Sequence, residues 1–180
     1  MEDISLHILD VAENSINAGA TLVKIRIVEK NDEDIFSVCI EDNGRGIPKE
    51  HLGDVLDPFY TTRTTRKVGM GLSLLTQAAR ETGGDVKISS AEERGSVVEA
   101  RFRPSHIDMK PLGDLADTLM VLIVGNPQAD FLFSYSRNGR ECAFDTRKVK
   151  AELEGVPINA PHVLIPLRRY LQDILAGVEG

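Results

Sequence analysis

Two pairs of alternating apolar segments constrain the fold of this chain more than any other feature. Residues 22–29 and 35–41 are rich in Val and Ile and flank a short polar turn, and residues 86–90 and 96–103 repeat this arrangement. Alternation with a period of two, interrupted by a polar turn, is typical of two paired antiparallel strands. The chain is therefore predicted to contain a mixed or antiparallel sheet built from at least these two hairpins.

A helix with a polar stripe is expected before the first hairpin. In residues 3–17 the polar positions recur at steps of four, three, four and three, while apolar residues occupy the other faces. These positions are Asp3, His7, Asp10, Asn14 and Asn17. His7 shares the stripe with Asp10 and could assist that carboxylate, but a satisfied surface histidine is the more common state and is what we expect.

Further helices complete a first unit, residues 1–104. Residues 48–55 predict a short helix, and residues 71–82 predict a longer one that stops at a Gly-Gly pair. Residues 61–68 have no apolar period and predict a loop. A chain of 180 residues is long enough for one such domain with a sizeable appendage. We place a linker at residues 105–117.

Residues 118–180 are expected to form a small α+β module. The continuous apolar run at 118–124 predicts a buried strand, and Asn138-Gly139 predicts a hairpin. The strands of that hairpin are expected at 131–135 and 141–144, and two helices at 146–154 and 161–178. The predicted fold class is α+β, a two-layer α/β sandwich with a mixed or antiparallel sheet and a small C-terminal α+β extension.

Charge and composition exclude some classes of function. A formal charge of -7 and a pI near 5.1 argue against a nucleic-acid backbone as the main partner, because such binding needs clustered Lys and Arg. The longest apolar run is too short to cross a bilayer, and the first residues lack the basic region of a signal peptide, so we expect a cytoplasmic protein. Cys39 and Cys142 are expected to be reduced, half-buried thiols.

Asn14 and Asp10 are candidates for metal binding and proton transfer. The amide oxygen of Asn14 suits Mg²⁺, which prefers a few protein oxygens and takes the rest from phosphates and waters. Asp10 lies one helical turn earlier on the same face and could accept a proton from the group that attacks a γ-phosphate. Taken alone, these two residues are better explained as part of an exposed polar helix face.

Two glycine-bearing segments suggest a nucleotide. Asp42 closes a strand and is followed by Gly44 and Gly46, so a carboxylate there could accept a hydrogen bond from the exocyclic amine of adenine. Gly69 and Gly71 precede a helix whose first free N–H groups can hold a phosphate. Ordinary turn chemistry and tight packing are the competing explanations.

Positive charge gathers just before that helix. Arg63, Arg66 and Lys67 stand close together in a chain that is otherwise acidic. A solvated loop would show the same charges, yet their position favours contact with phosphate.

Together these motifs resemble the family of ATPases and kinases that includes gyrase, Hsp90, histidine kinases and MutL. The resemblance covers residues 1–104 and implies a Bergerat-type ATP-binding fold that holds ATP or ADP with Mg²⁺. It implies that Asn14 is the metal ligand and that Asp10 is the catalytic carboxylate, where ATP-hydrolysing members usually have Glu. The nucleotide-binding residues that it implies are Asn14, Asn17, Asp42, Gly44, Gly46, Ile47, Phe59, Arg63, Lys67, Gly69, Met70, Gly71, Leu72 and Ser96.

The motifs of this chain resemble two different branches of the family. Residues 13–21 look like the mismatch-repair branch, whereas residues 57–63 followed by 69–75 look like sensor histidine kinases, and the second match is the longer. The first motif begins almost at Met1, and no histidine is followed by the usual acidic residue, so we expect the phosphoacceptor on a protein partner.

The expected function is therefore a histidine-kinase-like catalytic domain that binds Mg-ATP and transfers phosphate in signalling or regulation. Its partners would be ATP and a protein carrying the phosphoacceptor, with no nucleic acid and no membrane span, and a homo-oligomer is possible. The alternatives are an anti-sigma-type serine kinase, an ATP-gated conformational switch or ATPase without kinase activity, and a module that keeps a nucleotide as a structural cofactor.

Overall fold

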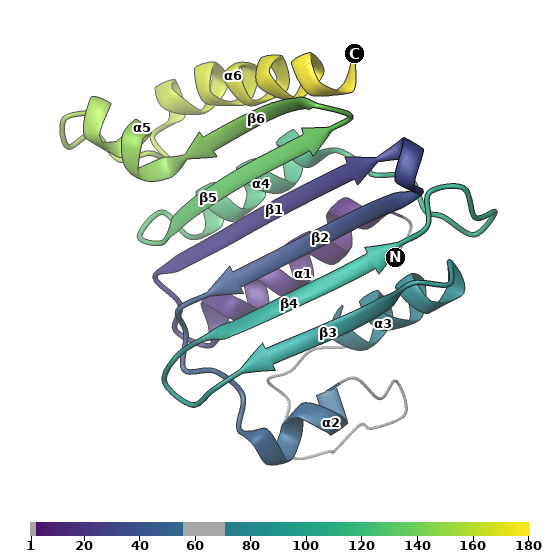
Figure 1. The fold of residues 1–180 in the computed structure, drawn as a ribbon. Helices are drawn as coiled ribbons and strands as arrows, with labels where there is room; N and C mark the ends of the chain where they lie inside the picture. The colour runs from purple at the N-terminus through teal and green to yellow at the C-terminus, as the bar shows by residue number, and fades with distance from the viewer. Residues whose placement is uncertain (1–2, 56–70) are drawn as a thin grey trace.

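A six-stranded sheet organises the fold (Figure 1). The computed structural model describes residues 3–55 and 71–180. In spatial order the strands are β3 (Asp85–Ser90), β4 (Ser96–Phe102), β2 (Ile35–Asp42), β1 (Leu22–Lys30), β5 (Asp130–Arg137) and β6 (Arg140–Asp145). Strands β1 and β5 run parallel, and every other neighbouring pair is antiparallel. The predicted mixed sheet is confirmed.

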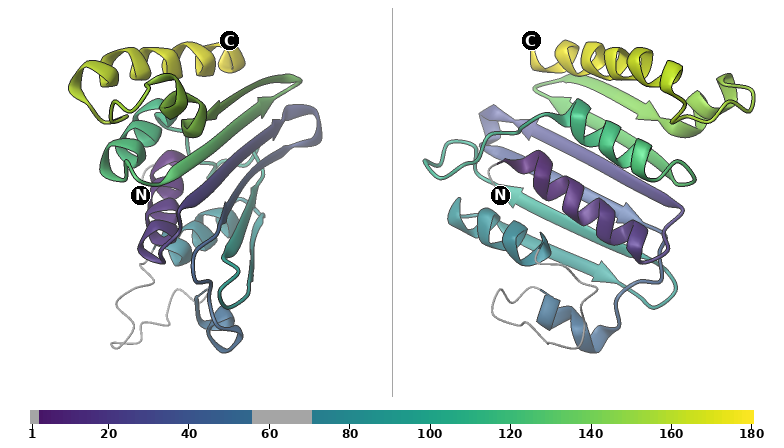
Figure 2. Two further views of the ribbon diagram at one scale, coloured as in Figure 1. Left: turned by 90° about the vertical axis from the view of Figure 1, so that its left-hand side faces the viewer. Right: turned by 180° about the vertical axis from the view of Figure 1, so that it is seen from behind.

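Helices cover one face of this sheet and leave the other open. Figure 2 shows α1, α3 and α4 side by side on the covered face, with α6 along the β6 edge. The helices are α1 (Ile4–Asn17), α2 (Leu52–Val55), α3 (Gly71–Glu81), α4 (Leu115–Gly125), α5 (Thr146–Glu152) and α6 (Pro161–Glu179), and two short 3-10 turns are η1 (Asn31–Glu33) and η2 (Lys49–His51). No helix among residues 3–55 and 71–180 is long and apolar enough to span a bilayer.

The alternation in β1 explains why one face is buried. Val23, Ile25 and Ile27 are at most 1% exposed, whereas Lys24 and Arg26 between them are exposed. Burying a side chain of this size stabilises the folded state by about 1.5–3 kcal/mol, so this register is strongly favoured over a shift by one residue.

The prediction of a buried strand at residues 118–124 is wrong, because this run lies within α4. Asp114 caps the helix, since its side chain accepts a hydrogen bond from the backbone N–H of Asp117 at 2.8 Å. The helix packs against both α1 and α6, so it is buried on most of its surface. A short apolar run does not by itself distinguish a buried strand from a buried helix.

The prediction that His7 is a surface residue is also wrong. Its side chain is 0% exposed, and neither ring nitrogen has a hydrogen-bond partner among the residues that the structure describes. Burial, followed by the positive charge of Lys110, lowers the pKa of His7 from its usual 6.5 to about 4. The imidazole is therefore neutral at neutral pH.

The C-terminal residues extend the same sheet. β5 pairs with β1 along its length, and the backbone N–H of Asp130 donates to the carbonyl oxygen of Thr21 at 2.8 Å. The segment predicted as a linker, residues 105–117, lies along the start of α1, where the N–H groups of Ile4 and Ser5 donate to Pro111 and Leu112 at 3.0 and 2.8 Å. The domain boundaries at 104 and 118 stay a prediction.

Candidate functional site

The Asp42 carboxylate is the centre of the candidate site. It stands at the end of β2, and the residue is only 8% exposed. Its Oδ1 accepts a hydrogen bond from the Gly44 N–H at 2.8 Å, and its Oδ2 accepts from the hydroxyls of Ser15 and Ser96 at 2.8 and 2.5 Å. Three donors from α1, from the turn after β2 and from β4 therefore fix the orientation of one buried acceptor.

Hydrogen bonds hold the turn after Asp42 against two neighbouring elements, α1 and β3. The Arg45 N–H donates to the carbonyl oxygen of Ala18 at the end of α1, and the Ile47 N–H donates to Ser90 Oγ on β3 at 2.7 Å. Gly46 has a φ of +74°, and a Cβ placed on it would lie 2.1 Å from the carbonyl oxygen of Ala91. Only glycine fits this close approach, which explains its place in the motif.

Asp10 of α1 lies directly against the start of α3. A Cβ placed on Gly71 would lie 2.9 Å from the Cβ of Asp10, so the two backbones approach closely only because residue 71 is glycine. Asp10 and Gly71, 61 positions apart in the sequence, are thus brought together as the motifs predict.

Asn14 lies one helical turn beyond Asp10, and its half-buried side chain has no hydrogen bond with any residue that the structure describes. Its amide oxygen therefore remains available as a ligand. Residues 3–55 and 71–180 contain no group of three His, Cys, Asp or Glu side chains placed to hold a metal ion. The donors present fit a Mg²⁺ ion that takes one protein oxygen and completes its shell with phosphates and waters.

The structure describes only some of the remaining predicted site residues. Asn17 is exposed at the end of α1, and Leu72 is 4% exposed and belongs to the hydrophobic core. Outside the described residues lie Phe59, Arg63, Arg66, Lys67, Gly69 and Met70.

Ser15 is the site residue that sequence reasoning missed. It follows Asn14 and falls off the polar stripe, on the face of α1 that packs inward, where it is 6% exposed. The available signal was a hydroxyl among the apolar positions of that face, since a buried hydroxyl needs a partner.

Two cavities are candidates for the location of the predicted chemistry. The one beside Asp42 measures about 300 Å³ and is lined by residues of β2, β3 and β4. A larger one, about 930 Å³, lies on the open face of the sheet, away from Asp42, and contains none of the motif residues. We assign the predicted chemistry to the Asp42 site because its buried carboxylate and its approach to α1 match that chemistry, whereas cavity size alone does not.

Comparison with known proteins places this arrangement in a family. The profile described as "Histidine kinase-, DNA gyrase B-, and HSP90-like ATPase" matches residues 2–106. The chain belongs to this family, as its motifs predicted.

Similar curated proteins are sensor kinases. A putative sensor histidine kinase NtrY-like of Rickettsia conorii is 28% identical over 110 residues, which are 61% of this chain and 18% of that protein. A signal transduction histidine-protein kinase of Streptomyces coelicolor, AfsQ2, is 32% identical over 93 residues, which are 49% of this chain and 17% of that protein. The chain thus spans less than a fifth of either relative.

Solved structures support the fold. The MutL ATPase domain of Aquifex aeolicus, complexed with ADP, superposes with a TM-score of 0.53 at 18% identity, covering 86% of this chain and 70% of that one. The N-terminal domain of a DNA repair protein gives 0.57 at 14% identity over the whole of this chain and 57% of that one. The predicted two-layer α/β sandwich is confirmed by these likenesses.

Proposed function

We propose that this chain is a histidine-kinase-like catalytic domain that binds Mg-ATP and transfers the γ-phosphate to a protein partner. The observation that carries the proposal is the buried Asp42 carboxylate, held by Ser15, Gly44 and Ser96 beside the helix that bears Asp10 and Asn14. The relatives named as sensor histidine kinases support the kinase half of the proposal.

Asp42 is suited to select the base. A carboxylate oxygen has two lone pairs, and among the described residues only the Gly44 N–H donates to Oδ1, so this oxygen can accept another hydrogen bond from the exocyclic amine of adenine. Guanine has a carbonyl oxygen at that position, which would face the carboxylate as a second acceptor. The site should therefore prefer adenine nucleotides.

The α1 residues would act on the phosphates and on the acceptor. Asn14 would hold Mg²⁺, which when bound neutralises phosphate charge. Asp10 would orient or deprotonate the attacking group, and the first backbone N–H groups of α3 at Gly71 would contact phosphate oxygens. Ile47 would lie on the base, with Asn17, Phe59, Arg63, Lys67, Gly69, Met70 and Leu72 as the remaining contacts of the nucleotide.

Calorimetry tests the nucleotide half. Wild-type protein is expected to bind ADP more tightly than GDP, and Asp42→Asn is expected to lose this preference while Asp85→Asn, an exposed carboxylate on β3, keeps it. Equal affinity of the wild type for the two nucleotides would contradict the assignment of Asp42.

Phosphate transfer requires a second experiment. The protein is incubated with γ-labelled ATP, Mg²⁺ and an extract of its own cells, and the labelled protein bands are resolved. Acid-labile label on a partner supports the proposal, whereas acid-stable phosphoserine would select the anti-sigma-type serine kinase.

A second candidate is an ATP-gated switch that hydrolyses ATP without labelling any protein. The continuous sheet favours it, because β1 joins the strand that ends at Asp42 to the C-terminal strand β5. Slow release of phosphate with no labelled band would select this candidate.

A further inference from the structure

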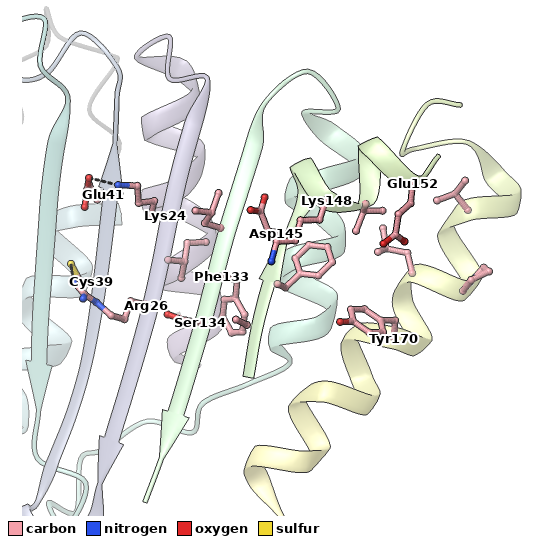
Figure 3. A pocket seen from close by; sticks show the side chains of 18 residues that line it. Lys24, Arg26, Cys39, Glu41, Phe133, Ser134, Asp145, Lys148, Glu152 and Tyr170 are labelled. Carbon is pink, nitrogen blue, oxygen red and sulfur yellow. Dashed lines mark hydrogen bonds and ion pairs between the residues drawn. The ribbon is translucent and has the colours of Figure 1, made fainter. Parts of the chain in front are cut away.

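The cavity on the open face of the sheet lies outside the nucleotide site proposed above. It has a volume of about 930 Å³ and is bounded by β1, β2, β5 and β6 together with α5 and the first half of α6 (Figure 3). Its residues come from both sides of the predicted linker, so only the complete chain forms it.

The apolar part of this cavity is recessed. Leu132 of β5, Val149 of α5 and Leu167 of α6 line it; the first two are half-buried, and Leu167 is 5% exposed. A protein partner would need a broad apolar surface, since each side of a standard interface buries about 800 Å². A concave site of this volume matches instead the range of about 300–1,000 Å³ in which small molecules bind.

Two cations of the cavity, Arg26 and Lys148, form no ion pair among the residues that the structure describes. Lys24 pairs with Glu41 at 2.8 Å, and Asp145 is held by Arg147 outside the lining. The Arg26 guanidinium contacts only the sulfur of Cys39, at 3.8 Å, among the residues that the structure describes.

The remaining charged residues of the cavity lie on α5. Lys148 and Glu152 stand four residues apart on α5, where neighbouring opposite charges face the same side of a helix. The hydrogen bonds from Arg147, followed by the positive charge of Lys148, lower the pKa of Asp145, so Arg26 is the lining cation that contacts no carboxylate among the described residues. Guanidinium groups bind carboxylates and phosphates through two parallel hydrogen bonds.

We propose that this cavity is a second binding site, whose ligand is a small amphipathic organic anion. The acidic group of the ligand pairs with Arg26, beside Ser134 on the neighbouring strand, and the apolar body lies against Leu132, Val149 and Leu167. The proposal does not depend on nucleotide binding.

The fluorescent probe 8-anilinonaphthalene-1-sulfonate, an apolar aromatic body with one sulfonate, tests the site in the full chain. Wild-type protein is expected to bind it saturably at one site, and excess ADP is expected not to displace it. Arg26→Gln should weaken its affinity about tenfold, as expected for loss of a charge-assisted pair. The matched control is Arg101→Gln, an exposed arginine on the same sheet face in β4, which should leave the affinity unchanged.

The two cysteines give an independent readout. Cys39 lines the cavity and Cys142 does not, although both are half-buried and free. The probe should slow alkylation of Cys39 by iodoacetamide and leave that of Cys142 unchanged, as followed by mass spectrometry. Ala143→Trp, which fills the cavity from an exposed position of β6, should abolish both the fluorescence and the protection.

Competition defines the chemical class of the ligand. Octanoate is expected to displace the probe, because it combines an acidic group with an apolar chain, whereas inorganic phosphate is not. The proposal is overturned if Arg26→Gln binds the probe as well as Arg101→Gln does, if Cys39 stays unprotected, or if ADP displaces the probe.

Discussion

The two hydroxyls on Asp42 allow a test of the site geometry by a double-mutant cycle. Ser15 and Ser96 donate to the same oxygen, Oδ2, of a carboxylate that is 8% exposed. A hydrogen bond to a charged group contributes about 1.5–3 kcal/mol. Each single change to alanine should cost about 1.5 kcal/mol, the lower end, because the other hydroxyl still satisfies Oδ2.

The double variant should cost more than the sum of the two single ones. With both hydroxyls gone, Oδ2 keeps a buried charge without a donor, so the coupling energy should be about 0.5–1 kcal/mol or more. The total loss, roughly 4 kcal/mol, is a large part of the 5–15 kcal/mol that is usual for a domain. Affinity for ADP should fall in the same order, because an unrestrained carboxylate no longer presents Oδ1 in one orientation.

Urea unfolding followed by circular dichroism measures these energies, provided that the slope of the transition is the same in all four proteins. The matched control is Ser105→Ala, which removes an equivalent 2.8 Å hydroxyl bond to Asp34 at an exposed site. It should cost less than about 0.5 kcal/mol and combine additively with Ser15→Ala. Additive losses for the Ser15 and Ser96 pair would refute the shared-oxygen geometry.

Three further changes test separate parts of the molecule. Asn14→Ala should weaken Mg²⁺-dependent ATP binding in calorimetry without changing the unfolding transition. His7→Leu should flatten the pH dependence of stability: the wild type, with its histidine pKa lowered from 6.5 to about 4, binds more protons when unfolded, so its stability falls as pH drops below 6.5, by about 3 kcal/mol near pH 4. Gly46→Ala should cost at least about 1–3 kcal/mol in urea unfolding, because residue 46 has a positive φ and its new Cβ would meet the Ala91 carbonyl.

Each of these has a contradicting result. Unchanged affinity of Asn14→Ala for Mg-ATP would remove the ligand assignment. An acid loss of stability that persists in His7→Leu would place the responsible group elsewhere. A Gly46→Ala variant as stable as the wild type would show that the turn tolerates a side chain.

Local patterns were sufficient to predict most of the sheet. The alternation in β1 and β2 carries its own register, because Val23, Ile25 and Ile27 must face the helices, and the turn residues between the strands fix the hairpin. The proximity of Asp10 and Gly71 was predicted from the family resemblance, because no local property of either residue predicts that they are in contact.

The periodicity of the sequence could not predict contacts between distant segments. In α4 the exposed positions are Asp117, Val121, Val124 and the terminal Gly125. Two of the four are valines, so the stripe does not appear as polar. His7 has the reverse problem, because a residue type that usually contacts water is buried without a hydrogen-bond partner in the described part of the chain. In both cases tertiary packing overrides the usual preference of the residue.

The last two residues of β2, Glu41 and Asp42, belong to different proposed sites. Glu41 lines the open-face cavity and the next residue, Asp42, points to the other side of the sheet, so one strand end belongs to both sites. A ligand that pairs with Arg26 competes with the Glu41–Lys24 pair beside it and so acts on the end of β2. Because coupling between two sites is reciprocal, any factor by which 8-anilinonaphthalene-1-sulfonate changes ADP affinity must equal the factor by which ADP changes affinity for the probe. We expect each ligand to raise the affinity for the other by a factor of about five, so that ADP does not displace the probe. This factor should be lost in Glu41→Gln, and equal ADP affinity with and without saturating probe would show that the strand does not connect the sites.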